Sequence, residues 1–234
     1  LQKEFVFINT KYNEKIVDKD KINIEIFFDE IEKSYIDRVN ILGNFITEEK
    51  VIRNALIVDE GDAYNEMLFN KSINELKAKN IFKSVKSQIN ASEKNKRNKI
   101  IDIVIEEKAT GEIFAGAGTG TSGSSITAGI KERNYLGKGI ALSTNLTLTD
   151  DEVKGKFSVT NPNFRNSDRS LTTTIESTST DLMTSSGYKT SRTGLGFGTG
   201  FEQYEDLFIN FDVSMYYEKL ETSNLASDIK KRQE

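Results

Sequence analysis

The sequence of 234 residues lacks cysteine, histidine and tryptophan and contains a single proline. Without cysteine or histidine, the chain has no ligands for a thiolate zinc site, no disulfide, and neither the nucleophile nor the base of a Cys- or His-based catalytic triad. We therefore expect a protein that is not an enzyme and binds no cofactor or metal. No segment reaches the roughly 18 consecutive apolar residues of a membrane helix, which leaves a β-barrel as the form in which the chain could span a bilayer.

An excess of charge of one sign is also missing, because 32 basic side chains stand against 36 acidic ones and the pI is about 5.3. Binding to nucleic acid through phosphate neutralisation needs a basic surface, so we expect no nucleic-acid partner. The first residue is Leu1, and no basic segment followed by an apolar core opens the chain. We expect an internal piece of a longer protein, in which a missing signal peptide says nothing about location.

The composition changes abruptly after Ala109. Residues 1–109 contain 39 charged residues, 7 Ser or Thr and 2 Gly, whereas residues 110–200 contain 17 charged residues, 29 Ser or Thr and 14 Gly. The first part is typical of a mixed soluble domain, and the second of either β-structure or disorder. The contrast predicts a domain boundary at Thr110-Gly111.

Alternation of apolar and polar residues favours β-structure for the second part. From Ile113 onward, apolar residues occupy alternate positions in seven consecutive segments, with mostly Gly, Ser, Thr, Asn, Lys or Asp between them. A disordered linker has no reason to keep a period of two, so the pattern predicts seven antiparallel strands. Two clear examples are Ile126, Ala128 and Ile130 in an early segment and Phe211, Val213 and Met215 in the last.

Two architectures can use such strands. A soluble β-sandwich turns the apolar face to a core, and an outer-membrane barrel turns it to lipid. Small uncharged residues on the other face, such as Gly194, Gly196 and Gly198, suit a crowded lumen better than a solvated surface. A bacterial barrel takes an even number of strands, at least about eight, so seven strands predict a partial barrel with further strands beyond the C-terminus.

Residues 35–108 predict the order strand, helix, helix, strand, strand. The first strand is 36–42, closed by a turn at Gly43-Asn44, and Thr47 is the predicted N-cap of the first helix. The second helix is predicted over 64–78. The remaining strands are predicted over 81–89 and 100–106, with one more over 22–28. Helix positions predicted to share a face or be buried are Val51, Ile52, Ala55 and Leu56, then Met67, Leu68, Ile73 and Leu76.

At this point the residues resemble a known family. The string YIDRVNILGNFITEEKVIRNALIVDEGDAYN (35–65), followed by NIFKSV (80–85), resembles the last POTRA (polypeptide-transport-associated) domain of the BamA family of outer-membrane assembly factors. The strings TGEIFAGAGTGT (110–121), ERNYLGKG (132–139) and SVTNPNF (158–164) are similar to the opening strands of that family's barrel. The resemblance covers about residues 22–220.

The resemblance implies an α+β POTRA domain followed by antiparallel transmembrane β-barrel strands. It divides the chain into the end of a preceding POTRA domain (1–34), a complete last POTRA domain (35–109), seven barrel strands (110–220) and a truncated loop (221–234). The implied function is insertion and folding of β-barrel proteins into the bacterial outer membrane, with the POTRA domain in the periplasm. The implied partners are the outer-membrane lipid bilayer, accessory lipoproteins similar to BamD, and unfolded β-barrel clients.

Three candidate sites follow from the resemblance. Glu60 matches a family residue at the contact with BamD. The first barrel strand meets the last at a weakly paired lateral seam in the family, where opening would expose strand-pairing groups to a client. The seam residues are Ile113, Ala115, Gly116, Ala117, Gly118 and Gly120. The strand over 81–89, with Phe82 and Val85, is a candidate edge for extended client peptides.

Each site has a simpler interpretation. The glycines of the seam strand could serve merely to relieve crowding at a curved strand. The spacing Gly118-x-Gly120-x-x-Gly123 also matches a dinucleotide-binding fingerprint, but a strand follows it rather than the helix that such a site needs. Asp59, Glu60 and Asp62 could be solvated or complement a helix dipole. Alternatives for the whole protein are a TamA-like or two-partner secretion transporter, or a soluble secreted β-sandwich or adhesin.

Overall fold

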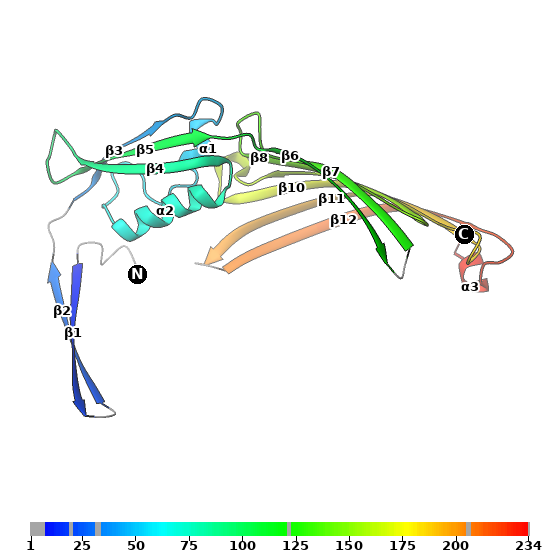
Figure 1. Ribbon diagram of the computed structural model, residues 1–234, viewed down its shortest axis with the longest axis horizontal. Coiled ribbons are helices and arrows are strands. Elements are labelled where there is room, and N and C mark those ends of the chain that lie inside the picture. The colour runs from blue at the N-terminus through cyan, green and yellow to red at the C-terminus, as the bar shows by residue number, and fades with distance from the viewer. Residues whose placement is uncertain (1–7, 19–20, 31–33, 121–122, 205–206, 234) are drawn as a thin grey trace. The chain divides into compact units, whose positions relative to one another are not determined.

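The computed structural model describes residues 8–18, 21–30, 34–120, 123–204 and 207–233 (Figure 1). The chain divides into two compact units. The first contains the residues up to 44 together with 55–107, and the second contains 45–54 together with the residues from 108 onward. Across the described ranges, no helix is both long enough and apolar enough to cross a membrane.

A three-stranded sheet lies at the centre of the first unit. It consists of β3 (Ile36–Leu42), β4 (Phe82–Ala91) and β5 (Lys99–Glu107) in the order β3-β5-β4. β3 runs parallel to β5 and β4 runs antiparallel to it. Alternate residues of the central strand β5 are buried, and these are Ile101, Ile103 and Ile105. With α1 and α2 between β3 and β4, the predicted order strand, helix, helix, strand, strand is confirmed.

The first helix is shorter than predicted. α1 spans only Glu49–Arg53, and its N-cap residue makes no side-chain cap bond. Thr47, the predicted N-cap, is buried, and its hydroxyl accepts a hydrogen bond from Nδ2 of Asn134 at 2.8 Å. Ala55 and Leu56, predicted on the same helical face as Val51, lie beyond the helix end. The N-cap prediction is wrong because the hydroxyl binds a partner 87 positions away in the chain.

The second helix, α2 (Glu66–Ala78), begins two residues later than predicted. Oδ1 of Asn65 caps it by accepting the backbone N–H groups of Met67 and Leu68 at 2.8 and 3.1 Å. Met67 was predicted to be buried but is exposed. The buried positions of the helix are Phe69, Ser72, Ile73 and Leu76. They recur at the three- and four-residue spacing of one helical face, and Met67 falls outside it.

A separate hairpin precedes this sheet in the chain. β1 (Ile8–Asp18) pairs antiparallel with β2 (Lys21–Glu30). β2 confirms the strand predicted over 22–28, whereas β1 was not predicted. The segment of β1 mixes charged residues with apolar ones, so period-two alternation is weak there.

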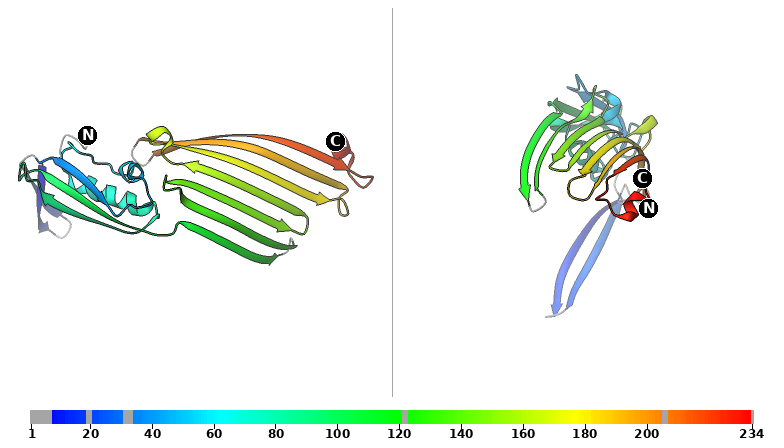
Figure 2. Two further views of the ribbon diagram at one scale, coloured as in Figure 1. Left: turned by 90° about the horizontal axis from the view of Figure 1, so that it is seen from above. Right: turned by 90° about the vertical axis from the view of Figure 1, so that its right-hand side faces the viewer.

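The second unit contains one antiparallel sheet of seven strands, seen side by side in Figure 2. The strands are β6 (Gly111–Gly120), β7 (Gly123–Tyr135), β8 (Ile140–Thr149), β9 (Glu152–Asn161), β10 (Arg169–Leu182), β11 (Tyr188–Tyr204) and β12 (Leu207–Thr222). They follow each other in chain order from β6 at one edge to β12 at the other. A sandwich needs two packed sheets, so the β-sandwich alternative does not fit this unit.

The register places the alternating apolar residues of the seven strands on one face. One row crosses the sheet through Phe157, Ile175, Leu195 and Met215, each directly opposite the next. The opposite face carries Ser, Thr, Asn and Gly, and also an ion pair in which Nζ of Lys154 lies 3.7 Å from Oε1 of Glu176. The predicted partition into an apolar and a polar face is confirmed.

Short connections join neighbouring strands of this sheet. Three of them lie at 136–139, 150–151 and 162–168, and a short 3₁₀ helix, η1 (Phe164–Asn166), lies in the last of these. After β12 the chain forms one short helix, α3 (Asp228–Lys231).

Candidate functional site

The predicted seam strand is β6, an edge strand of the seven-stranded sheet. Within the described part of the chain it pairs only with β7, in a continuous register from Gly111 opposite Glu132 to Gly120 opposite Gly123. An edge strand carries a row of backbone N–H and C=O groups on its outer side that are available for pairing. The sheet has a second edge strand, β12, and the role of β6 at a lateral seam stays a prediction.

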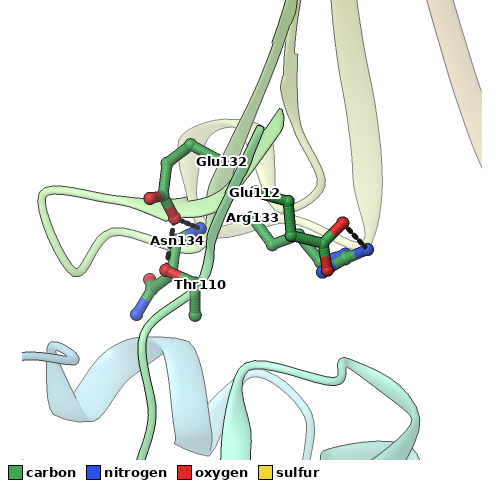
Figure 3. A network of polar contacts seen from close by, with 5 residues as sticks. All are labelled: Thr110, Glu112, Glu132, Arg133 and Asn134. Carbon is green, nitrogen blue, oxygen red and sulfur yellow. Dashed lines mark hydrogen bonds and ion pairs between the residues drawn. The ribbon is translucent and has the colours of Figure 1, made fainter. Parts of the chain in front are cut away.

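Side chains anchor residues 110–114, which are Thr110 and the first four residues of β6. The guanidinium of Arg133 donates two hydrogen bonds to the carboxylate of Glu112, at 2.5 and 3.0 Å. The hydroxyl of Thr110 donates to Oε1 of Glu132, which also accepts the backbone N–H of Asn134 at 2.7 Å (Figure 3). Two-pronged arginine–carboxylate pairs are among the stronger polar contacts of proteins. We call residues 110–114 the anchored half of β6.

Phe114 completes the anchored half on the polar face of the sheet. A Cβ atom added at Gly129 would lie only 2.4 Å from Cζ of Phe114, so the ring lies directly over this glycine. Nζ of Lys131 lies 5.3 Å from the ring centroid, within range of a cation–π interaction. The glycine in β7 is thus required by the aromatic ring of β6.

Residues 115–120 form the rest of β6, and we call them the bare half. The six residues Ala115, Gly116, Ala117, Gly118, Thr119 and Gly120 are all exposed. A Cβ atom added at Gly116 or Gly120 would meet nothing within 4 Å among the described residues, and at Gly118 it would make ordinary contact with Ser125. Crowding by the described residues therefore does not require these glycines. Ile113, the remaining predicted seam residue, is 85% exposed.

Asn134 links the β7–β8 hairpin to the segment 45–54. Besides donating to Thr47, it accepts the backbone N–H of Gly139 at its Oδ1, at 2.7 Å. The backbone N–H of Glu48 donates to the carbonyl oxygen of Gly137 at 2.8 Å. Sequence reasoning missed this cluster, because no local signal joins Asn134 to a residue 87 positions earlier.

Glu60, the predicted lipoprotein contact, lies in the first unit. Its Oε1 accepts the backbone N–H of Val39 in β3 at 3.0 Å. Asp59 and Asp62 likewise accept backbone N–H groups, from Glu60 at 2.8 Å and from Asp59 at 2.9 Å. These carboxylates hold a turn against the edge of β3, and among the described residues no three acidic side chains form a group that could hold a metal ion.

The predicted client edge, β4, is an edge strand of the three-stranded sheet. Phe82 and Val85 are buried, so only their backbone groups could reach a client peptide. On the exposed side of β4, Lys83 forms a hydrogen-bonded ion pair with Glu106, which also accepts the hydroxyl of Ser84 at 3.2 Å. The bond from Lys83 and then that from Ser84 hold the pKa of Glu106 below its ordinary value.

Comparisons with known proteins match both units. Residues 34–108 match the family model of the POTRA domain, described as a surface antigen variable number repeat, and residues 134–233 match that of the Omp85 superfamily domain. β6 lies between the two matched ranges. The outer membrane protein assembly factor BamA of Buchnera aphidicola is 28% identical over 172 residues, which is 69% of this chain and 27% of that protein.

Two solved structures share the fold. BamA from Haemophilus ducreyi lacking POTRA domains 1–3 superposes with a TM-score of 0.72 at 23% identity, over 94% of this chain and 43% of that one. CdiB from Acinetobacter baumannii superposes with a TM-score of 0.60 at 11% identity, over 94% of this chain and 44% of that one. The chain thus spans less than a third of the curated relative and less than half of either solved chain.

These matches confirm the sequence-based recognition and its fold class, and they imply a location in the outer membrane. The chain thus contains a POTRA domain at 34–108 followed by part of an Omp85 superfamily domain at 134–233, with the fold of a partial outer-membrane β-barrel, and it is similar to BamA proteins in sequence and in fold.

Proposed function

We propose that the protein containing this chain inserts and folds β-barrel proteins in the bacterial outer membrane, and that the bare half of β6 templates the strands of its clients. The observation that carries this proposal is the contrast within β6, which is anchored by side chains at 110–114 and exposed with small residues at 115–120. A strand held at one end and bare at the other can expose its outer edge to an incoming strand while its base stays in place.

The proposed activity is not enzymatic. Adding a strand to an edge exchanges hydrogen bonds with water or a neighbouring strand for hydrogen bonds with a client, and no covalent bond changes. The chain therefore needs no nucleophile or cofactor for this role. Its partners would be the lipid bilayer, unfolded β-barrel clients and a lipoprotein similar to BamD that contacts Glu60, with the POTRA domain on the periplasmic side.

A disulfide across the seam tests the proposal. In the full-length protein, Ala117→Cys paired with a cysteine on the last barrel strand should abolish client insertion in proteoliposomes when oxidised, and a reductant should restore it. The matched control is Gly118→Cys with Ser125→Cys, which lie opposite each other in β6 and β7 and lock β6 to β7 while leaving the seam free. Normal insertion with the seam locked would contradict the proposal.

The second candidate is a secretion transporter. The similarity to CdiB, a two-partner secretion protein, favours it, and a TamA-like protein is a further relative to consider. A transporter of this kind would export one cognate substrate through its lumen and leave β-barrel clients unassembled. The proteoliposome assay with an unrelated β-barrel client therefore separates the two functions.

A further inference from the structure

A cluster of exposed apolar side chains lies at the end of the β7–β8 hairpin. Phe45 is 95% exposed, Ile46 67% and Leu136 68%, and Tyr135 is also exposed. Single exposed apolar residues are ordinary on protein surfaces, but a group of large ones marks an interaction site. We call these four residues the rim patch.

The backbone brings the two parts of the rim patch together. A Cβ atom added at Gly137 would lie 2.0 Å from the carbonyl oxygen of Ile46, so residue 46 lies directly against the hairpin turn. The bond from Glu48 N–H to the Gly137 carbonyl and the bond from Asn134 to Thr47 hold the next two residues at the same turn. All of these residues belong to the second unit.

The rim patch continues the apolar face of the barrel sheet. A register shift in β7 places Tyr135 opposite Ile140. Ile140 lies two residues before Leu142, on the face that carries the apolar rows. In an outer-membrane barrel this face contacts lipid, and aromatic residues border it at the membrane interface. Through Tyr135, the patch therefore adjoins the lipid-contacting face at the end of the strands.

Charges beside the patch suit the headgroups of phospholipids. Lys50 bonds to Glu48 at 2.6 Å, and this bond, with a smaller contribution from Lys138, lowers the pKa of Glu48. Lys138 is exposed in the hairpin turn. The exposed Lys138, two residues after Leu136, therefore offers an ammonium group to a lipid phosphate beside the patch.

We propose that the rim patch inserts into the headgroup region of the phospholipid leaflet of the outer membrane and anchors the segment 45–54 at the membrane surface. This inference rests on the proposed function, which places the POTRA side of the barrel in the periplasm. Burial of exposed apolar side chains in the interface drives the insertion. A membrane is the favoured occupant because the patch is continuous with the lipid-contacting face of the strands.

Depth measurements with single thiols test this inference. Residues 1–234 contain no cysteine. In the full-length protein, Phe45→Cys and Leu136→Cys therefore each give one labelling site within these residues for a fluorescent probe. The matched controls are Leu146→Cys on the apolar face and the adjacent Thr147→Cys on the polar face of β8. The labelled proteins are reconstituted in phosphatidylethanolamine–phosphatidylglycerol vesicles that contain lipids brominated close to the headgroup.

The expected result is strong loss of fluorescence at Phe45→Cys, Leu136→Cys and Leu146→Cys, with Thr147→Cys left bright. If Leu146→Cys is quenched while both patch sites stay as bright as Thr147→Cys, the rim patch does not contact lipid. This result would contradict the inference and leave the proposed function standing. If Leu146→Cys and Thr147→Cys are quenched equally, the assignment of the lipid-contacting face fails, and with it both the inference and the proposed barrel orientation.

Discussion

Asn134 joins two segments that lie 87 positions apart in the sequence. Its side chain donates to Thr47 and accepts from Gly139, and both Asn134 and Thr47 are buried. A buried polar group whose partner is removed loses its hydrogen bond without regaining water. This amide therefore stabilises the junction between segment 45–54 and the barrel hairpin, together with the backbone bond from Glu48 to Gly137.

Substitution at this amide should loosen the junction. We expect Asn134→Ala to destabilise the folded protein by about 1–3 kcal/mol, because it removes the buried hydrogen bond to the Thr47 hydroxyl and the bond from the Gly139 N–H. Denaturant unfolding in detergent micelles measures the effect. Thr47→Val removes one of the same bonds, so the double variant should lose less than the sum of the single losses. Additive losses would show that the two side chains act independently.

Glu60 combines a structural role with a proposed partner role, and a matched pair of variants separates them. Glu60→Gln keeps an oxygen that can accept the Val39 N–H, whereas Glu60→Lys removes the acceptor and reverses the charge. We expect Glu60→Lys to reduce recovery of the BamD-like lipoprotein in a pull-down with the full-length protein. Normal recovery would refute the partner role, and equal loss in Glu60→Gln would identify the negative charge as the determinant.

At the scale of elements, the two halves of β6 predict opposite outcomes for glycine substitutions. A side chain at Gly116 would meet no other atom of the described residues, so Gly116→Val should fold. The higher strand propensity of valine should stabilise the barrel by up to about 1 kcal/mol. A side chain at Gly129 collides with Phe114 and with the carbonyl oxygen of Thr144, so Gly129→Val should destabilise the barrel by about 1–3 kcal/mol or more.

The difference in gel mobility between heated and unheated samples measures barrel folding for both variants. In the proteoliposome assay we further expect Gly116→Val to fold normally and yet assemble clients more slowly, because it adds a side chain to the bare half. Full activity in a well-folded Gly116→Val protein would favour the interpretation of the β6 glycines as neutral in function.

The strands could be predicted from the sequence far better than the junction. Period-two alternation depends only on neighbouring residues, and it located all seven strands of the barrel sheet. The predicted N-cap of α1 was wrong because Thr47 binds Asn134, 87 positions away. The predicted burial of Met67 was wrong because the buried face of α2 contains Phe69, Ile73 and Leu76, and Met67 falls outside it. Which face of a helix packs on the sheet depends on tertiary contacts that the local sequence does not contain. The rim patch was missed for the same reason.

At the scale of the whole molecule, the unit boundary does not follow the POTRA boundary. Segment 45–54 lies within the residues that match the POTRA model but belongs to the unit of the barrel sheet. The chain therefore leaves the first unit after residue 44 and returns to it at residue 55. The backbone therefore passes between the two units three times, at 44–45, 54–55 and 107–108.

Cross-linking of a client strand to β6 during assembly would detect templating itself. A full-length protein with Ala117→Cys is mixed with a stalled client that carries single cysteines along its terminal strand. If β6 pairs with the client, disulfide adducts form at alternate client positions, as in a paired strand, and none form with Ile175→Cys in β10, which is paired on both sides. Equal adducts at both sites, or none at Ala117→Cys while assembly proceeds, would contradict templating by β6.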